Sequence, residues 1–231
     1  MKVFAQVVKA LTVNQVELLI SESPIDYEVA INFMNQRVSN IQEGDAPEAL
    51  WLLEHPALYT AGTSAKKEDH LGTLDIPVYE TGRGGQFTYH GPGQRVAYVM
   101  LDLSKRSKDV RAFISKIERW ATLALGEFSL LPKTYSDRVG LWVDTPFGEE
   151  KIAAIGVRLK KWVSLHGISI NVSPDLNHFR GIVPCGISDK GVTSLEALGL
   201  PVSMADLDVA LIKHFQTCFG APLTEAQSLD I

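Results

Sequence analysis

Residues 83–98 read RGGQFTYHGPGQRVAY, a strand-like alternation that two groups of glycines interrupt. Gly84 and Gly85 permit backbone angles closed to other residues and let a ligand approach the main chain. Bare amides there can bind an oxyanion or a carbonyl, and Arg83 adds a cation. The plain alternative is a glycine bulge or tight turn beside a surface arginine, with His90 as a hydrogen-bonded residue at a strand end. The stretch therefore predicts either a ligand-binding turn or a purely structural one.

Neither glycine-rich segment of the chain fits a phosphate-binding motif. Residues 82–87, GRGGQF, lack the third glycine of the dinucleotide fingerprint, and a strand follows where that motif needs a helix. Residues 186–193, GISDKGVT, have two glycines and a threonine at P-loop spacing, but Val192 stands where the phosphate-binding lysine should be. The sequence therefore predicts no nucleotide-binding loop at either place.

Helical and strand-like segments surround the glycine-rich stretch on both sides. Residues 23–44 have helical spacing, with Ser23 as the expected N-cap, Pro24 in the first turn and Gly44 as the end. Apolar spacing predicts further helices and strands. The helices are expected at 109–128 and 204–220, and the strands at 48–55, 76–81 and 94–103.

The second half of the chain predicts a meander. Residues 138–173 alternate well enough for three antiparallel strands, with turns at 146–150 and near 160–162. Residues 174–191 have the composition of an ordered loop, and the tail at 221–231 is expected to fray. Helices near both ends with strands between them predict an α/β or α+β fold, in which helices flank a mixed, largely antiparallel sheet.

Composition narrows the class of protein. Twenty-two Lys and Arg against 27 Asp and Glu give a net charge of -5, which offers no overall field to attract nucleic acid. The start resembles no leader peptide and no apolar run is long enough for a bilayer, so a cytoplasmic protein without membrane contact is expected. The six histidines and two cysteines lack metal-ligand spacing, so neither a metal nor a cofactor is expected. Without a linker or a repeat, residues 1–231 are expected to form one domain.

Cys185 and Lys151 are the candidates for chemistry. Cys185 lies between a proline and a glycine, a loop setting that can present a nucleophile, although a lone cysteine is more often a small buried hydrophobe. Lys151 follows an acidic turn, where lysines are usually solvated, but the small residues Ala154 and Gly156 after it leave room for a ligand. Cys218 lies at helical spacing after apolar residues and is expected in the core. A disulfide between the two cysteines is not expected.

Three blocks of the chain resemble the lipoyl(octanoyl) transferases, which move an octanoyl group from acyl carrier protein to a lysine of lipoyl domains. Residues 83–98 resemble the signature of that family, and KIAAIG at 151–156 resembles its lysine strand. PCGI at 184–187, together with HGISINVSPDLNHF at 166–179, resembles its cysteine loop. The resemblance implies a fold like that of the biotin and lipoate protein ligases, in which these blocks converge.

The resemblance also implies roles for individual residues. Cys185 matches the acyl-thioester nucleophile, and Lys151 matches the partner lysine that lowers the pKa of the thiol and acts as acid and base. The positions that match the lining of the acyl pocket are Arg83, Gly84, Gly85, Gln86, Phe87, Thr88, Tyr89, His90, Ala154, Ile155, Gly156, Gly167, Ile168 and Ser169.

These residue types suit the transfer of an activated acyl group. One thioester exchanges for another at little free-energy change, so no ATP is required, and a cation beside a cysteine raises the reactive thiolate fraction. Burial of an eight-carbon chain at ~0.8 kcal/mol per methylene calls for a narrow apolar groove, with Arg83 and His90 expected at its mouth. The amides after Cys185, with His90, are candidate donors to the oxyanion.

The expected partners are two proteins. The donor is octanoyl-acyl carrier protein, and the acceptors are lipoyl domains of 2-oxoacid dehydrogenase subunits and the glycine cleavage H protein. Both kinds of partner are typically acidic, so a local basic patch is expected to bind them. The candidates for that patch are Arg95, Lys133, Arg158, Lys160 and Lys161.

Three alternatives stay open at the level of sequence. An ATP-dependent lipoate or biotin ligase of the same fold would use the matching lysine and need no cysteine. A carrier-binding or regulatory module of the same fold would have a dead site. A cysteine hydrolase would pair Cys185 with His90 or His166.

Overall fold

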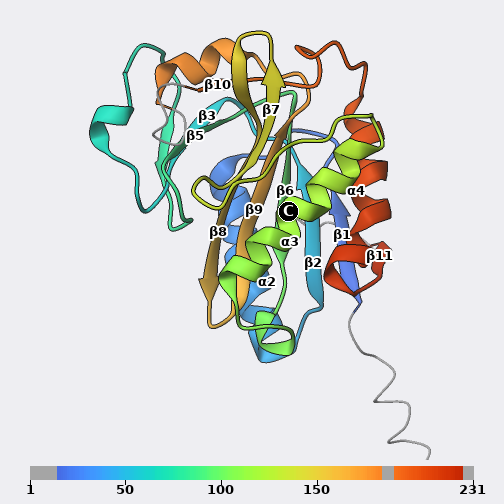
Figure 1. Cartoon of the computed structure of the whole chain (residues 1–231). Helices are drawn as coiled ribbons and strands as arrows, with labels where there is room; N and C mark the ends of the chain where they lie inside the picture. The colour runs from blue at the N-terminus through green and yellow to red at the C-terminus, as the bar shows by residue number, and fades with distance from the viewer. Residues whose placement is uncertain (1–14, 184–189, 226–231) are drawn as a thin grey trace, which may run out of the picture.

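Two β-sheets and their covering helices form the frame of the protein (Figure 1). The computed structural model describes residues 15–183 and 190–225, so Cys185 lies outside the described residues. The main sheet runs in the order β10 (Gly191–Val192), β8 (Gly148–Lys160), β9 (Val163–Asn171), β6 (Gln94–Met100), β2 (Glu48–Leu53), β1 (Val16–Ile20) and β11 (Leu223–Glu225), and β7 (Leu141–Thr145) pairs with β8. The second sheet has the order β4 (Val78–Glu80), β3 (Leu58–Ala61) and β5 (Phe87–His90).

The main sheet is mixed, with its centre antiparallel. β2 with β6, β6 with β9, β9 with β8, and β8 with β7 are antiparallel pairs. Parallel pairs occur toward the edges, where β1 pairs with β2 and β11 and where β10 pairs with β8. The predicted mixed, largely antiparallel sheet is therefore confirmed, as is the meander β7–β8–β9.

Helices cover both faces of the main sheet. α2 (Tyr27–Glu43) packs Ala30, Met34 and Val38 against one face, and its core is separate from that of the opposite face. α3 (Val110–Gly126) and α4 (Met204–Phe219) pack on the opposite face, in front of the sheet in Figure 1. Cys218 is buried in that second core, as its spacing predicted.

The start of α2 differs from the expectation. Asp26 is the N-cap, because its side chain accepts hydrogen bonds from the amides of Glu28 and Val29, so the helix begins later than Ser23 and Pro24 suggested. Its end was predicted correctly. Gly44 has a φ of 84° and its amide bonds back to the last turn, which is a left-handed cap that glycine adopts without strain.

Five strands were missed in the sequence, among them the two-residue edge strand β10. β1 lies in the apolar run VELLI, and β3 and β5 are short strands of the second sheet. β11 lies at 223–225, in the tail that was expected to fray, and pairs with β1. The opening stretch is therefore not one interrupted strand. Its Gly91–Gly93 turn carries the chain from β5 in one sheet to β6 in the other.

Arg95 on β6 and Asp208 on α4 form a buried ion pair that joins the sheet to the helix. Nη2 of Arg95 donates to Oδ2 of Asp208 at 2.9 Å, and Nε lies 2.8 Å from Oδ1. Burial raises the pKa of Asp208 to about 6, and Arg95 opposes that rise. We expect Asp208→Asn to lower the free energy of unfolding by about 3–5 kcal/mol, because the guanidinium is left buried without its anion.

Urea unfolding of the Asp208→Asn variant measures this loss. The matched control is Asp144→Asn, which removes the anion from an exposed pair with Lys133. That change is expected to alter the free energy of unfolding by less than about 1 kcal/mol. Equal losses in the two variants would contradict the assignment of the buried pair as a structural element.

Over residues 15–183 and 190–225, every helix falls short of the length and apolarity that a bilayer crossing demands.

Candidate active site

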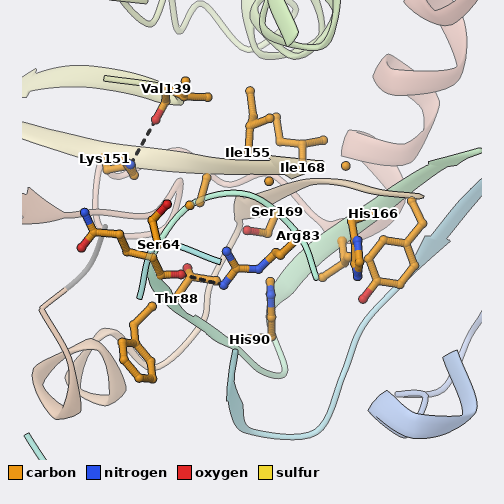
Figure 2. Close-up of a pocket in the computed structure, with 18 of the residues that line it drawn as sticks. Ser64, Arg83, Thr88, His90, Val139, Lys151, Ile155, His166, Ile168 and Ser169 are labelled. Carbon is orange, nitrogen blue, oxygen red and sulfur yellow. Dashed lines mark hydrogen bonds between the residues drawn. The ribbon is translucent and has the colours of Figure 1, made fainter. Parts of the chain in front are cut away.

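A cavity of about 430 Å³ lies between strands β8 and β9 and the segment that leads into and along β5 (Figure 2). Its volume is in the range of small-molecule pockets. Residues 137–139, from the loop between α3 and β7, also contribute to the lining. The full lining is Tyr27, Ser64, Arg83, Gly85, Gln86, Phe87, Thr88, His90, Val96, Tyr98, Asp137, Arg138, Val139, Lys151, Ala154, Ile155, Gly156, His166, Gly167, Ile168 and Ser169.

Lys151 lies at one end of this cavity and is only 6% exposed. Its Nζ donates a hydrogen bond to the backbone carbonyl of Val139 at 3.2 Å, as Figure 2 shows. The same Nζ lies 4.6 Å from the ring centre of Trp142, whose face attracts a cation. The solvated alternative for Lys151 is therefore excluded by its burial.

Arg138 fixes the loop that carries the Val139 carbonyl. Its guanidinium carbon lies 3.9 Å from the ring centre of Tyr135 and 4.8 Å from that of Trp142. Arg138 also forms an ion pair with Glu149, which accepts a hydrogen bond from the hydroxyl of Tyr135. The Trp142 ring thus contacts two cations, and the loop is tied to β7 and β8 beside Lys151.

Arg83 holds the turn that precedes β5. Its Nη2 donates to the hydroxyl and the carbonyl of Thr60 at 2.6 and 2.7 Å, and to the carbonyl of Gln86 at 2.9 Å. The residue is 7% exposed, so the surface-arginine alternative is wrong. These hydrogen bonds tie the turn to strand β3 of the second sheet.

The glycines of the site differ in the structural constraint that favours glycine at each position. Gly85 has a φ of 91°, which other residues rarely adopt. Gly84 has no positive φ, and an added Cβ would meet only the Val157 carbonyl at 3.5 Å, so the conformational freedom of glycine is used at Gly85 and not at Gly84. A Cβ at Gly156 would lie 3.0 Å from Arg83, so this glycine makes room for the turn.

A directed chain of hydrogen bonds sets the tautomer of His90. The side-chain amide nitrogen of Asn171 donates to the carbonyl of Thr193 at 2.9 Å, and the Asn171 oxygen accepts from the amide nitrogen of Gln94 at 2.9 Å. That nitrogen also donates to the carbonyl of Tyr89, so the Gln94 oxygen must face His90. Nδ1 of His90 lies 2.7 Å from this oxygen and donates to it. Nε2 of neutral His90 is therefore an acceptor.

Burial keeps three histidines around the cavity neutral. It lowers the pKa of His55 to about 4 and the pKa values of His90 and His166 to about 3. The cation of Arg83 lowers the pKa of His90 and His166 further. The expectation that His90 donates to an oxyanion is therefore not supported, since its neutral form has its proton on Nδ1.

Most of the predicted site residues meet at this cavity. Gly84 and Tyr89 do not contribute to its lining, and Tyr89 instead packs with Tyr59 and Phe179 under the second sheet. Cys185 lies outside the described residues. The prediction did not include Tyr27, Tyr98, Val139 or the partner Trp142. Tyr98 ends the 83–98 stretch and Trp142 pairs with Lys151 in the β7–β8 hairpin, so these two had a signal in the sequence. Nothing in the local sequence ties Tyr27 or Val139 to Lys151.

The sequence model of the lipoyl protein ligase A/B catalytic domain matches residues 26–216. The chain belongs to this family. Members of the lipoyl protein ligase A/B family named octanoyltransferase are close relatives. One from Brucella suis is 57% identical over 219 residues, which cover 91% of this chain and 82% of the relative. One from Parvibaculum lavamentivorans is 58% identical over 213 residues, which cover 90% of this chain and 95% of the relative.

Solved structures share the fold at low identity. The bipartite lipoate protein ligase of Thermoplasma acidophilum has a TM-score of 0.69 at 15% identity, over 94% of this chain and 88% of that one. A biotin protein ligase of Aquifex aeolicus has a TM-score of 0.52 at 13% identity, over 87% of this chain and 69% of that one. The predicted likeness to the lipoate and biotin ligases is thus confirmed for the fold.

Octanoyl transfer is the activity of this member of the lipoyl protein ligase A/B family, because its relatives at 57% and 58% identity are octanoyltransferases. The chain is therefore an enzyme of lipoate biosynthesis, and the alternative of an inactive module is wrong. The ligases resemble it only at the level of fold, so ATP-dependent ligation has no comparable support.

Proposed function

We propose that the octanoyl group passes from a carrier thioester to Cys185 and then to a lysine amine, with Lys151 as acid and base. The observation that carries this proposal is the buried amine of Lys151 at one end of a cavity floored by small and apolar residues of β8 and β9. Val139 and Trp142 hold that amine in place. Cys185 lies outside the described residues and enters through its match to the family's nucleophile.

The first half-reaction exchanges one thioester for another. The Cys185 thiol gives its proton to Lys151, and the thiolate attacks the octanoyl carbonyl. The carrier sulfur leaves and takes the proton from Lys151. One proton thus passes from Cys185 to Lys151 and on to the leaving sulfur.

The second half-reaction forms an amide. The neutral amine of an incoming lysine attacks the octanoyl thioester, and the Cys185 sulfur leaves as a thiolate. Lys151 takes a proton from the attacking nitrogen and returns it to that sulfur, which restores the starting pair. His90 offers only an acceptor here, so the amides after Cys185 are the proposed donors to the oxyanion.

The proposed donor is an octanoyl acyl carrier protein, and the proposed acceptors are lipoyl domains, including that of the glycine cleavage H protein. The lipoate protein ligase of Thermoplasma acidophilum is described with its E2 lipoyl domain, which supports an acceptor of this kind. The expected basic patch needs correction. Arg95 is buried against Asp208, and Lys160 lies at the far end of β8 from Lys151.

Mass spectrometry tests the covalent step. The wild-type enzyme mixed with octanoyl carrier protein, without acceptor, is expected to gain the mass of one octanoyl group on Cys185, and Cys185→Ser is expected to gain none under the same brief exposure. Added lipoyl domain should remove the adduct and appear octanoylated. Transfer by Cys185→Ser at the wild-type rate would overturn the thioester route, and adduct loss as free octanoate would support the hydrolase alternative.

A further inference from the structure

His166 has an unusual backbone conformation inside strand β9. Its φ is 64°, whereas the strand around it is extended. Regular alternation would put His166 on the same face as Ile168 and Ile170, which belong to the core under α3 and α4. The left-handed kink instead turns His166 toward Tyr98, which belongs to the core under α2, and His166 lines the cavity there. The cavity lining includes residues of both faces, since Ile168 also contributes to it. A non-glycine residue in this region is strained, and such strain is often kept for function.

Hydrogen bonding within the described chain does not explain the kink. Neither Nδ1 nor Nε2 of His166 has a hydrogen-bond partner among the described residues, although the side chain is 5% exposed. A buried ring with unpaired nitrogens is unfavourable in itself. The position of the ring, and not a hydrogen bond that it makes, is therefore the feature to explain.

His166 rests on a rigid support. Its ring meets Tyr98 edge to face, with ring centres 5.9 Å apart. Tyr98 donates its hydroxyl hydrogen to Nε2 of His55 at 2.8 Å, and Nδ1 of His55 donates to the carbonyl of Ile25 at 2.6 Å. A molecule that pushes against His166 would thus push against a fixed chain of side chains.

The ring lies at the opposite end of the cavity from Lys151. In the β8–β9 ladder, Ala154 faces Ser169, Gly156 faces Gly167 and Val157 faces His166, so the pairs lead stepwise away from Lys151. Figure 2 shows the same order, with Lys151 at one side of the view, His166 at the other, and Arg83 and His90 between them.

We propose that His166 is the stop for the acyl chain and sets its maximum length. This inference rests on the proposed function, because it takes the octanoyl carbonyl to lie beside Lys151 and the methyl end to point toward His166. A longer chain would have to move a ring that Tyr98 and His55 hold in place. The specificity for octanoyl would then come from a backbone kink that turns one side chain into the cavity.

His166→Gly is the decisive variant. Glycine adopts a φ of 64° without strain, so the strand can keep its path while the stop is removed. We measure kcat/KM for octanoyl-, decanoyl- and dodecanoyl-carrier protein with one lipoyl-domain acceptor. The decanoyl-to-octanoyl ratio is expected to rise about tenfold, because two further methylenes gain an apolar place. His166→Asn, which also tolerates this φ and fills part of the space, is expected to give a smaller rise.

Ser169→Gly is the matched control. It also enlarges the cavity on β9, but at the step opposite Ala154, so its ratio of decanoyl to octanoyl transfer is expected to stay at the wild-type value. An unchanged ratio in His166→Gly, or an equal rise in Ser169→Gly, would overturn the stop. If the wild-type enzyme gained no octanoyl adduct on Cys185 in the absence of acceptor, the proposed route would be overturned instead, so the two failures are distinguishable.

Discussion

A Lys151→Met enzyme is expected to transfer octanoyl groups about 10²–10⁴-fold more slowly than the wild type at neutral pH. Methionine fills the buried space without an amine, so the proton of Cys185 loses its acceptor. Steady-state kcat/KM with octanoyl carrier protein and a lipoyl domain measures the loss. The defect is expected to shrink toward pH 9, because an ordinary cysteine with a pKa near 8.5 then ionises unaided.

Lys160→Met is the matched control for this loss. Lys160 ends the same strand, β8, but is exposed and distant from the cavity. Its removal is expected to leave kcat/KM within about twofold of the wild-type value, since single exposed charges contribute little. A Lys151→Met enzyme with normal activity and a normal Tm would remove Lys151 from the mechanism.

Acid is expected to destabilise the protein well above the usual pKa range of its carboxylates. The unfolded chain has histidine pKa values near 6.5, whereas burial lowers those of His55, His90 and His166 to between about 3 and 4. Below pH 6.5 the unfolded chain therefore binds more protons. The contribution of these histidines to the free energy of unfolding is fully present above pH 6.5. It falls as the pH drops toward 4, by up to about 1.4 kcal/mol per pH unit for each histidine.

Urea unfolding between pH 7 and pH 5 measures this slope. Asp208 acts in the opposite direction, because burial raises its pKa to about 6 and the folded state then binds the extra proton. His166→Asn removes one of the three buried rings, so its slope is expected to be smaller than that of the wild type. A slope unchanged by this substitution, or a stability independent of pH over this range, would contradict neutral burial of His166.

The frame of this fold was largely readable from the sequence, because its long elements have clear periodicity. α3 and the meander β7–β8–β9 lie where the apolar spacing predicted them. The short strands β3 and β5 could not be read in the same way, since four residues give too little alternation to distinguish a strand from a loop. They form by pairing with each other in the second sheet, and no local sequence pattern predicts that pairing.

The site was readable only in part. Motif resemblance brought Lys151 and the strands β8 and β9 together, and the cavity lies beside them. It could not show that Val139 holds the lysine, because the α3–β7 loop has no sequence pattern that ties it to β8. The kink at His166 was also hidden, since a positive φ at a histidine depends on tertiary packing and leaves no mark on composition.

The chain of hydrogen bonds that sets the tautomer of His90 connects the edge of the main sheet to this cavity residue. Its last acceptor is the carbonyl of Thr193, next to the two-residue edge strand β10. A slip of that edge would release the amide of Asn171, then that of Gln94, and the imidazole could move its hydrogen to the other nitrogen. The edge strand β10 would thereby decide whether Nε2 of His90 accepts a hydrogen bond from a bound molecule or donates one to it.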